Sequence, residues 1–325
     1  MKRITLATFL VLITALCAGQ RVTADVEFAT AAGTPKTNKA FVTPAQNDFR
    51  FIIFGDRTGG HRPHIFETAI TQVNLLQPEF VIGVGDLIEG YTEDSNQLIK
   101  EWDEFDSIIS QLQAPFFYVA GNHDLSNSTM LELWRERYGR DYYDFRYKNA
   151  LFLVLNTEDP PIALPQEIIQ KQLALEAMMA KDPVTTQQRI LSASKSRGQA
   201  PKLPGSVAIS EAQVSYFAQV LNNNQDVDWT FVIMHKPAWL YENAAFTEIE
   251  EALGTRPYTV IAGHEHYYSH QKRNGRDYLD IGTTGGVWLQ DGEGRFDHIT
   301  HVTMSGEVPI IANIKLEGLF GAELK

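Results

Sequence analysis

The chain has 325 residues, of which 44% are apolar and 21% are charged, and its formal net charge is −12. This composition is ordinary for a soluble globular protein, and it excludes collagen-like, disulfide-scaffold and wholly disordered proteins. The acidity also argues against non-specific binding to nucleic acid, which depends on clustered Lys and Arg. The length suits one large domain or two small ones.

The first 24 residues have the pattern of a secretory signal peptide. Lys2 and Arg3 form a basic start, and residues 4–18 are a nearly unbroken apolar run that is short for a bilayer span. Small residues up to Ala24 predict cleavage there, and hence a secreted or periplasmic protein without a cysteine. A membrane anchor or a buried helix is the alternative, and Cys17, the only cysteine, leaves lipidation open. After residue 24 no apolar run is long enough to predict a membrane span.

Residues 25–48 are rich in Ala, Thr, Pro and Asn, which predicts a flexible leader. From residue 49 onward, short apolar runs end in polar clusters. The runs predicted as strands are 50–55, 79–85, 115–120, 150–156, 229–234 and 258–262. Their weak alternation indicates strands that are buried on both faces.

Helical patterns lie between these strands. Apolar residues from Phe66 to Leu76 fall on one helical face, and Ser210 with Gln213 forms a capping box. Alternating strands and helices predict an α/β domain over residues 49–325. After Gly275 the helical patterns stop, and residues 278–281, 298–304 and 309–316 predict strands of a second, more antiparallel sheet. His298 and His301, on opposite faces of one of these strands, are interpreted as structural.

An insertion at about residues 160–208 interrupts the alternation. Residues 165–181 predict an amphipathic helix. Residues 184–205 contain no acidic residue but carry four basic ones, Arg189, Lys195, Arg197 and Lys202. A solvated loop is one interpretation, and a basic lid over a substrate site is the other.

Polar residues follow five of the predicted strands. They are Asp56, Asp86, Asn122-His123-Asp124, His235 and His264-Glu265-His266, most of them next to a glycine. Ligands of α/β sheets bind outside the carboxyl ends of the strands, so we expect these side chains to meet at one edge. Carboxylates, imidazoles and one amide oxygen suit Mn, Fe or Zn better than Ca. Asp86 has two carboxylate oxygens and could bridge two divalent ions about 3.5–4 Å apart, which is an arrangement for phosphoryl chemistry.

In this order the motifs resemble those of the calcineurin-like metallophosphoesterase superfamily. Its pattern is Asp-x-His, Gly-Asp, Gly-Asn-His-Asp/Glu, His and Gly-His-x-His, and the match runs from Asp56 to His266. The resemblance implies a four-layer α/β/β/α sandwich that binds two metals at the carboxyl ends of its strands.

The resemblance also implies roles for individual residues. The first metal would be held by Asp56, Asp86 and His266, and the second by Asp86, Asn122, His235 and His264. His123 would contact the phosphoryl group and protonate the leaving oxygen, and Asp124 would orient His123.

One position departs from the superfamily pattern, because Asp56-Arg57-Thr58 stands where Asp-x-His is usual. The missing ligand could be replaced by the Thr58 hydroxyl, by water, or by His61 or His64 from the following loop. Arg57 could bind a substrate phosphate or form a salt bridge.

The sequence thus predicts an exported hydrolase of phosphoric monoesters or diesters with two divalent metal ions, Mn, Fe or Zn. A metal-held hydroxide would attack phosphorus, Asn122 and Arg57 would bind the substrate, and His123 would serve as the general acid. The expected partner is a small phosphorylated substrate. The alternatives are a non-enzymatic metal-binding module on the same fold and a metal-dependent nuclease.

Overall fold

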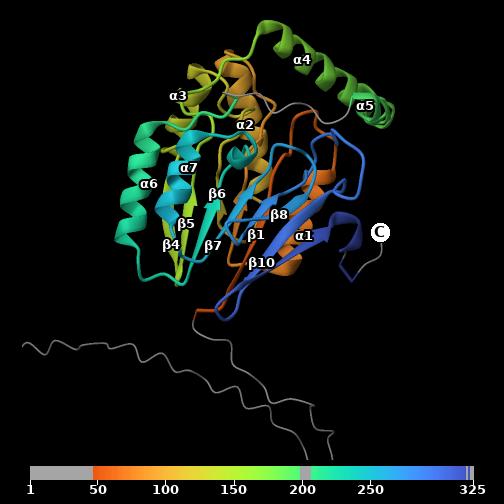
Figure 1. Ribbon diagram of the computed structural model, residues 1–325. Coiled ribbons are helices and arrows are strands. Elements are labelled where there is room, and N and C mark those ends of the chain that lie inside the picture. Colours follow the sequence, from red (N-terminus) through yellow and green to blue (C-terminus); the bar gives the residue numbers. More distant parts are fainter. Residues whose placement is uncertain (1–46, 198–205, 320, 323–325) are drawn as a thin grey trace, which may run out of the picture. The chain divides into compact units, whose positions relative to one another are not determined.

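The computed structural model describes residues 47–197, 206–319 and 321–322 (Figure 1). The predicted signal peptide and nearly all of the predicted leader lie outside the described residues. In the part of the chain that is described, none of the helices combines the length and the apolar character needed to cross a membrane.

Five strands form the first sheet, in the order β11-β10-β1-β2-β3. Their bounds are β1 (Phe49–Phe54), β2 (Phe80–Gly83), β3 (Phe116–Phe117), β10 (His298–Met304) and β11 (Pro309–Lys315). The strands β1, β2 and β3 are parallel, whereas β10 runs antiparallel to both β1 and β11.

Six strands form the second sheet, in the order β4-β5-β6-β7-β9-β8. Their bounds are β4 (Tyr143–Tyr147), β5 (Ala150–Val154), β6 (Trp229–Ile233), β7 (Tyr258–Ala262), β8 (Ser269–Arg273) and β9 (Arg276–Asp280). The four inner strands are parallel, and β4 and β8 are antiparallel edge strands. The expectation that the strands after Gly275 form a sheet of their own is therefore wrong. Strand β9 continues the second sheet, while β10 and β11 extend the first.

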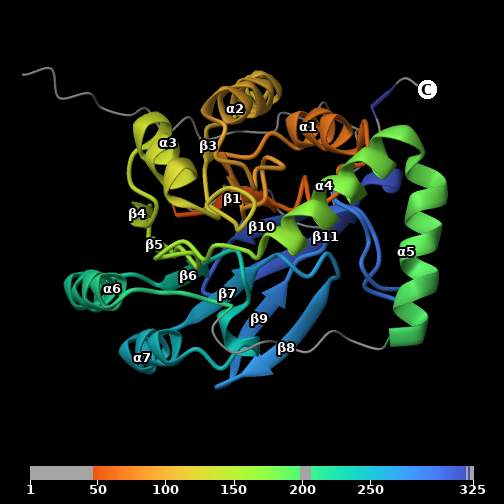
Figure 2. The same ribbon diagram turned by 90° about the horizontal axis from the view of Figure 1, so that it is seen from above.

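Helices cover the outer face of each sheet (Figure 2). The first sheet is covered by α1 (Ile65–Leu76), α2 (Ser95–Ile109) and α3 (Ser128–Tyr138), and the second by α6 (Glu211–Asn223) and α7 (Ala244–Leu253). Short 3₁₀ turns, η1 (Ala238–Leu240) and η2 (Leu316–Gly318), follow β6 and β11. The predicted capping box is present, because the Ser210 side chain accepts a hydrogen bond from the backbone N–H of Gln213 at the start of α6.

Aromatic side chains fill the space between the two sheets. The Phe51 ring, which is fully buried on β1, lies 5.1 Å from Phe80 of its own sheet and 5.3 and 5.1 Å from Phe152 and Phe231 of the other. Edge-to-face packing of such rings adds to the free energy gained from burying them. Both faces of β1 and β2 are thus covered, one by helices and one by the second sheet, and the predicted four-layer α/β/β/α sandwich is confirmed.

The insertion is a pair of helices, α4 (Gln166–Lys181) and α5 (Pro183–Arg197). Helix α4 matches the prediction. Helix α5 corrects the loop interpretation of residues 184–205 as far as Arg197, and residues 198–205 lie outside the described part. The sequence of α5 shows no apolar stripe, because this helix buries little beyond Thr186 and Gln187. The Asp182 carboxylate accepts a hydrogen bond from the Thr185 N–H at 3.0 Å, and this side-chain cap helps to start the helix.

Candidate metal centre

The carboxyl ends of β1, β2, β6 and β7 meet at the boundary between the two sheets. Backbone hydrogen bonds join the loops that follow these strands, from the Asp56 N–H to the Gly85 carbonyl at 3.1 Å and from the Gly263 N–H to the His235 carbonyl at 2.9 Å. The two sheets meet here as well, because the His264 N–H after β7 donates to the Asp56 carboxylate after β1 at 2.9 Å. Both sheets therefore contribute side chains to a single edge, where the sequence predicts the ligands.

The backbone at this edge has an uncommon conformation. Asp56, Asp86, His264 and His266 all have positive φ, between 50° and 78°. This left-handed conformation costs free energy in residues other than glycine, and it tends to be kept where function requires it. Neighbouring glycines leave room for the carboxylates, since a Cβ at Gly121 would lie 2.3 Å from Asp86 Oδ1.

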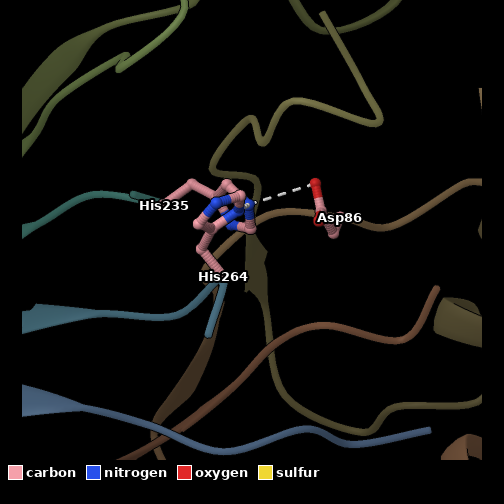
Figure 3. A group of neighbouring side chains, drawn as sticks. All are labelled: Asp86, His235 and His264. Atoms are coloured by element: carbon pink, nitrogen blue, oxygen red, sulfur yellow. Dashed lines mark hydrogen bonds and ion pairs between the residues drawn. The ribbon is translucent and has the colours of Figure 1, made fainter. Parts of the chain in front are cut away.

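Two groups of potential metal ligands share Asp86. One consists of Asp86, His235 and His264, and the other of Asp56, Asp86 and His266, with ligand atoms within 4.8 Å of one another in each group. Figure 3 shows the first group, in which the two imidazoles approach Asp86 from the loops of the second sheet. His235 Nε2 lies 3.2 Å from Asp86 Oδ1 and 3.2 Å from His264 Nδ1.

Hydrogen bonds to carbonyl groups set which nitrogen of two histidines faces the centre. Nδ1 of His235 lies 2.8 Å from the Val84 carbonyl, and Nδ1 of His266 lies 2.5 Å from the Val287 carbonyl. A carbonyl only accepts, so each Nδ1 carries a proton and Nε2 is the ring nitrogen that is left to bind a metal at the centre. This is how histidines that bind metals are usually oriented.

Asn122 also belongs to the centre. Its Oδ1 lies 3.0 Å from His235 Nε2. The structure thus places all six predicted ligands at one edge, although Asn122 is an amide neighbour of the Asp86 group rather than a member of the group of charged ligands.

Burial and ion pairing compete in the electrostatics of the centre. Burial opposes the charge on His235, but the Asp86 carboxylate outweighs burial and raises the pKa of His235 to about 9. Burial raises the pKa of Asp56 against the opposing effect of His235, and it lowers the pKa of His264, with His235 adding to the effect. Burial also lowers the pKa of His266 to about 4. Burial opposes ionisation of Asp86, but His235 and His123 hold its pKa well below the usual range.

These residues fit divalent metal ions. Asp56 is fully buried, and its Oδ2 has no hydrogen-bond partner among the described residues. An unpaired buried carboxylate oxygen is costly, and a cation would offset that cost. Neutral imidazoles and carboxylates are also the ligands that Zn, Mn and Fe accept.

The usual histidine of the first motif has no replacement among the charged ligand groups of the described residues. The Thr58 hydroxyl lies 2.9 Å from the Asp86 carbonyl and 2.7 Å from the Ile88 carbonyl. It donates its hydrogen to these two backbone carbonyls of the loop after β2. His61 and His64 are not members of either ligand group. His64 is exposed at the start of α1, and His61 is partly buried.

Arg57 has the salt bridge that the sequence left open as an alternative. Its guanidinium donates to Glu104 at 2.6 Å and to the Leu87 carbonyl at 3.1 Å, and it lies near the rings of Phe66 and Phe105. These contacts place Arg57 between α1 and α2, so in this structure it fixes the loop after β1 rather than lining the metal centre.

Asp124 differs from its predicted role. Its carboxylate accepts hydrogen bonds from the backbone N–H groups of Leu87, Ile88 and Gly121, at 2.8–3.2 Å. Among the described residues, the hydrogen bonds of this carboxylate therefore come from the two loops that carry Asp86 and Asn122, and none involves the His123 ring. Asp124 orders the loops instead of orienting His123.

Glu89 takes the place beside His123 that the sequence assigned to Asp124. His123 Nδ1 lies 2.7 Å from the Glu89 carbonyl and 3.9 Å from its carboxylate. The same carboxylate accepts from the N–H groups of residues 59–61. The sequence analysis missed Glu89, and the available signal was its position three residues after Asp86 in a loop already predicted to line the site.

The fold and this site define an α/β/β/α sandwich with two candidate metal-ligand groups at the edge where its sheets meet. A model of the calcineurin-like phosphoesterase family matches residues 49–268, more than half of the chain. The protein therefore belongs to the calcineurin-like phosphoesterase family.

Curated relatives match over a shorter stretch. Serine/threonine-protein phosphatase CPPED1 of Rattus norvegicus is 31% identical over 106 residues, which cover 30% of this chain and 34% of the relative. The Homo sapiens protein is 33% identical over 103 residues, covering 28% and 31%. The chain thus spans about a third of the length of these relatives.

Solved structures share the fold at low identity. A dimetal phosphatase from Danio rerio has a TM-score of 0.57 at 13% identity, covering 82% of this chain and 96% of that one. A purple acid phosphatase from yellow lupin (Lupinus luteus) has a TM-score of 0.56 at 13% identity, covering 84% and 52%. These similarities support the α/β/β/α architecture.

Proposed function

We propose that the protein is an exported hydrolase of phosphoric monoesters or diesters that uses two divalent metal ions. The observation that carries the proposal is the pair of ligand groups that share Asp86, with His123 beside them. Phosphatases among the relatives and similar structures support a phosphorylated substrate.

The proposed ligands divide into two sets. Asp56, Asp86 and His266 would hold the first metal, and Asp86, Asn122, His235 and His264 the second. When bound, two such ions supply an activated water as nucleophile and neutralise charge on the phosphoryl group.

His123 is suited to proton transfer by its surroundings. Its Nδ1 donates to the Glu89 carbonyl, so Nε2 is the ring nitrogen that faces the centre, 3.9 Å from Asp86 Oδ2. When the ring is positively charged, Nε2–H can donate its proton to the leaving oxygen. The nearby Glu89 carboxylate stabilises that charge, and the backbone N–H of His123 donates to Asp86 Oδ1 at 3.0 Å.

Export is proposed from the signal-peptide pattern of residues 1–24.

A role in selecting substrates is proposed for the insertion, which consists of α4 and α5. A Cβ at Gly60, in the loop after β1, would lie 3.4 Å from Leu175 of α4, so this helix borders the loop that carries Asp56. We extend the lid interpretation to both helices and propose that they limit which phosphoric esters reach the metal centre.

Substitution of His123 tests the proposal. Because a general acid matters only when the leaving group is poor, His123→Ala should lose roughly 10²–10⁴-fold in rate on an alkyl phosphate and much less on a nitrophenyl phosphate. His123→Ala should keep its metal content, measured on the purified protein. The matched control is His235→Ala, which should lose metal and also lose activity on both esters. Loss of metal from His123→Ala, or equal losses on both esters, would contradict the acid role.

A further inference from the structure

Tyr91 is a buried tyrosine at the edge of the metal centre, and it has no role in the proposed reaction. Only 8% of its surface is exposed, and it lies in the loop after β2, five residues beyond Asp86. Its backbone has a φ of 50°, which is unfavourable for a large aromatic residue. The surrounding structure must offset this cost, and such strain is typical of functional positions.

Several contacts hold the turn of Tyr91 in place. The N–H of Gly90 donates to Glu101 of α2 at 2.9 Å, and the Thr92 carbonyl accepts from the Asn127 side chain at 3.0 Å. A Cβ at Gly90 would lie 1.8 Å from the His123 carbonyl oxygen, so the turn is pressed against the next metal-site loop. The ring of Tyr91 also packs edge-to-face on the His123 ring, with centroids 4.4 Å apart. The phenol is therefore fixed before any ligand arrives.

The hydroxyl of Tyr91 contacts the amide of Asn122. Asn122 Nδ2 donates a short hydrogen bond to this hydroxyl, while Asn122 Oδ1 lies 3.0 Å from His235 Nε2 on the other side of the amide. The terminal torsion of an asparagine has no strong preference of its own. Its orientation is therefore set by the partners of its two amide atoms.

We infer that Tyr91 is a positioning residue that holds the NH₂ group of Asn122, in the orientation in which the amide oxygen faces the second metal. This inference rests on the proposed dinuclear centre. A cation attracts the amide oxygen and repels the NH₂ group, so an amide that turns freely has to be ordered when the metal binds. A partner that already holds the NH₂ group removes that cost, as residues behind metal ligands commonly do.

The test is a titration of metal-free protein with Mn²⁺, in which unbound Mn²⁺ is followed by electron paramagnetic resonance. Tyr91→Phe removes the hydroxyl but keeps the ring against His123, and it should weaken one of two Mn²⁺ sites about 10–100-fold, the usual effect of losing a partner behind a ligand. Tyr143→Phe is the matched control, because it also deletes a tyrosine hydroxyl with a hydrogen bond, here to the Tyr118 carbonyl at 2.7 Å. It should leave both affinities unchanged.

A double-mutant cycle separates positioning from a general loss of structure. In an Asn122→Ala background the amide is absent, so adding Tyr91→Phe should weaken Mn²⁺ binding no further. An equal loss in both backgrounds, or unchanged Mn²⁺ binding by Tyr91→Phe alone, would overturn the inference and leave the dinuclear centre standing. Unmodified protein that binds no Mn²⁺ would instead overturn the proposed manganese-competent centre and this inference together.

Discussion

His298 should make the protein sensitive to acid, independently of its metals. The side chain is 1% exposed on β10, and burial lowers its pKa to about 4, against a small opposing effect of the Phe296 carbonyl. Its Nδ1 is 3.4 Å from that carbonyl, and its Nε2 has no partner among the described residues. The folded protein therefore holds this ring neutral, while the unfolded chain protonates it near its ordinary pKa of about 6.5.

The direction and the size of this acid effect on the free energy of unfolding follow from the difference in proton binding between the folded and unfolded states. Because the pKa is lower in the folded state, the unfolded state binds more protons as the pH falls, and stability is lost below about pH 6.5. With a folded-state pKa of about 4, the loss due to this histidine at pH 4.5 is roughly 2–3 kcal/mol relative to pH 7.5.

The contribution of His298 is measured by urea unfolding of His298→Phe and of the unmodified protein. Both proteins are unfolded at pH 4.5 and at pH 7.5 in excess chelator. The free energy of unfolding should fall by roughly 2–3 kcal/mol less in the variant. Only the change with pH is compared, so any packing cost of the larger ring cancels. His301→Phe is the control, and we expect it to have a smaller effect because that ring, on the other face of β10, remains partly exposed. Equal acid sensitivity of His298→Phe and the unmodified protein would refute the reasoning.

Three further outcomes are expected. Metal analysis of protein purified without chelator should approach two ions per chain, and a value of one would indicate that Thr58 leaves the first site non-functional. Mass spectrometry of protein from the native host should show a chain that begins near Asp25, whereas an intact Met1 on exported protein would contradict cleavage. Replacing the insertion with a short linker should raise the Michaelis constant for large anionic substrates more than for a small aryl phosphate. Equal changes for both would leave α4 and α5 without a role in selection.

The sequence predicted the parts of the fold that repeat a simple pattern. The inner strands, such as β5 and β6, are buried at every position because each lies between two covering layers. Their largely apolar sequences reflect this burial, so the strands could be predicted. The edge strand β8 was missed because all five of its residues are exposed, so it carries no apolar signal. The partners of β10 were also mistaken, since strand pairing depends on contacts between distant parts of the chain.

The candidate site was predictable as a set of ligands but not as a network of contacts. Each ligand follows a strand, and the strand ends could be read from the apolar runs, so the convergence of Asp56, Asp86 and His235 followed from topology. Which carboxylate lies beside His123 depends on how two loops cross. The family resemblance favoured Asp124, but in the structure its oxygens accept hydrogen bonds from backbone N–H groups.

The altered first motif shows how one loop can exchange a ligand for structural contacts. Arg57 reaches α2 through Glu104, and the Thr58 hydroxyl donates to carbonyls of the Asp86 loop, so both residues fix the position of Asp56 and of the shared carboxylate. A histidine at position 58 would give up the contacts of that hydroxyl. With Thr58 at this position, the first metal would have three protein ligands. The second metal would have four, because Asn122 adds to the second set alone. Because the first ion has fewer ligands to release, it should leave before the second as chelator is added. The unequal number of ligands follows from the loop after β1, which is held in place by residues that do not bind metal.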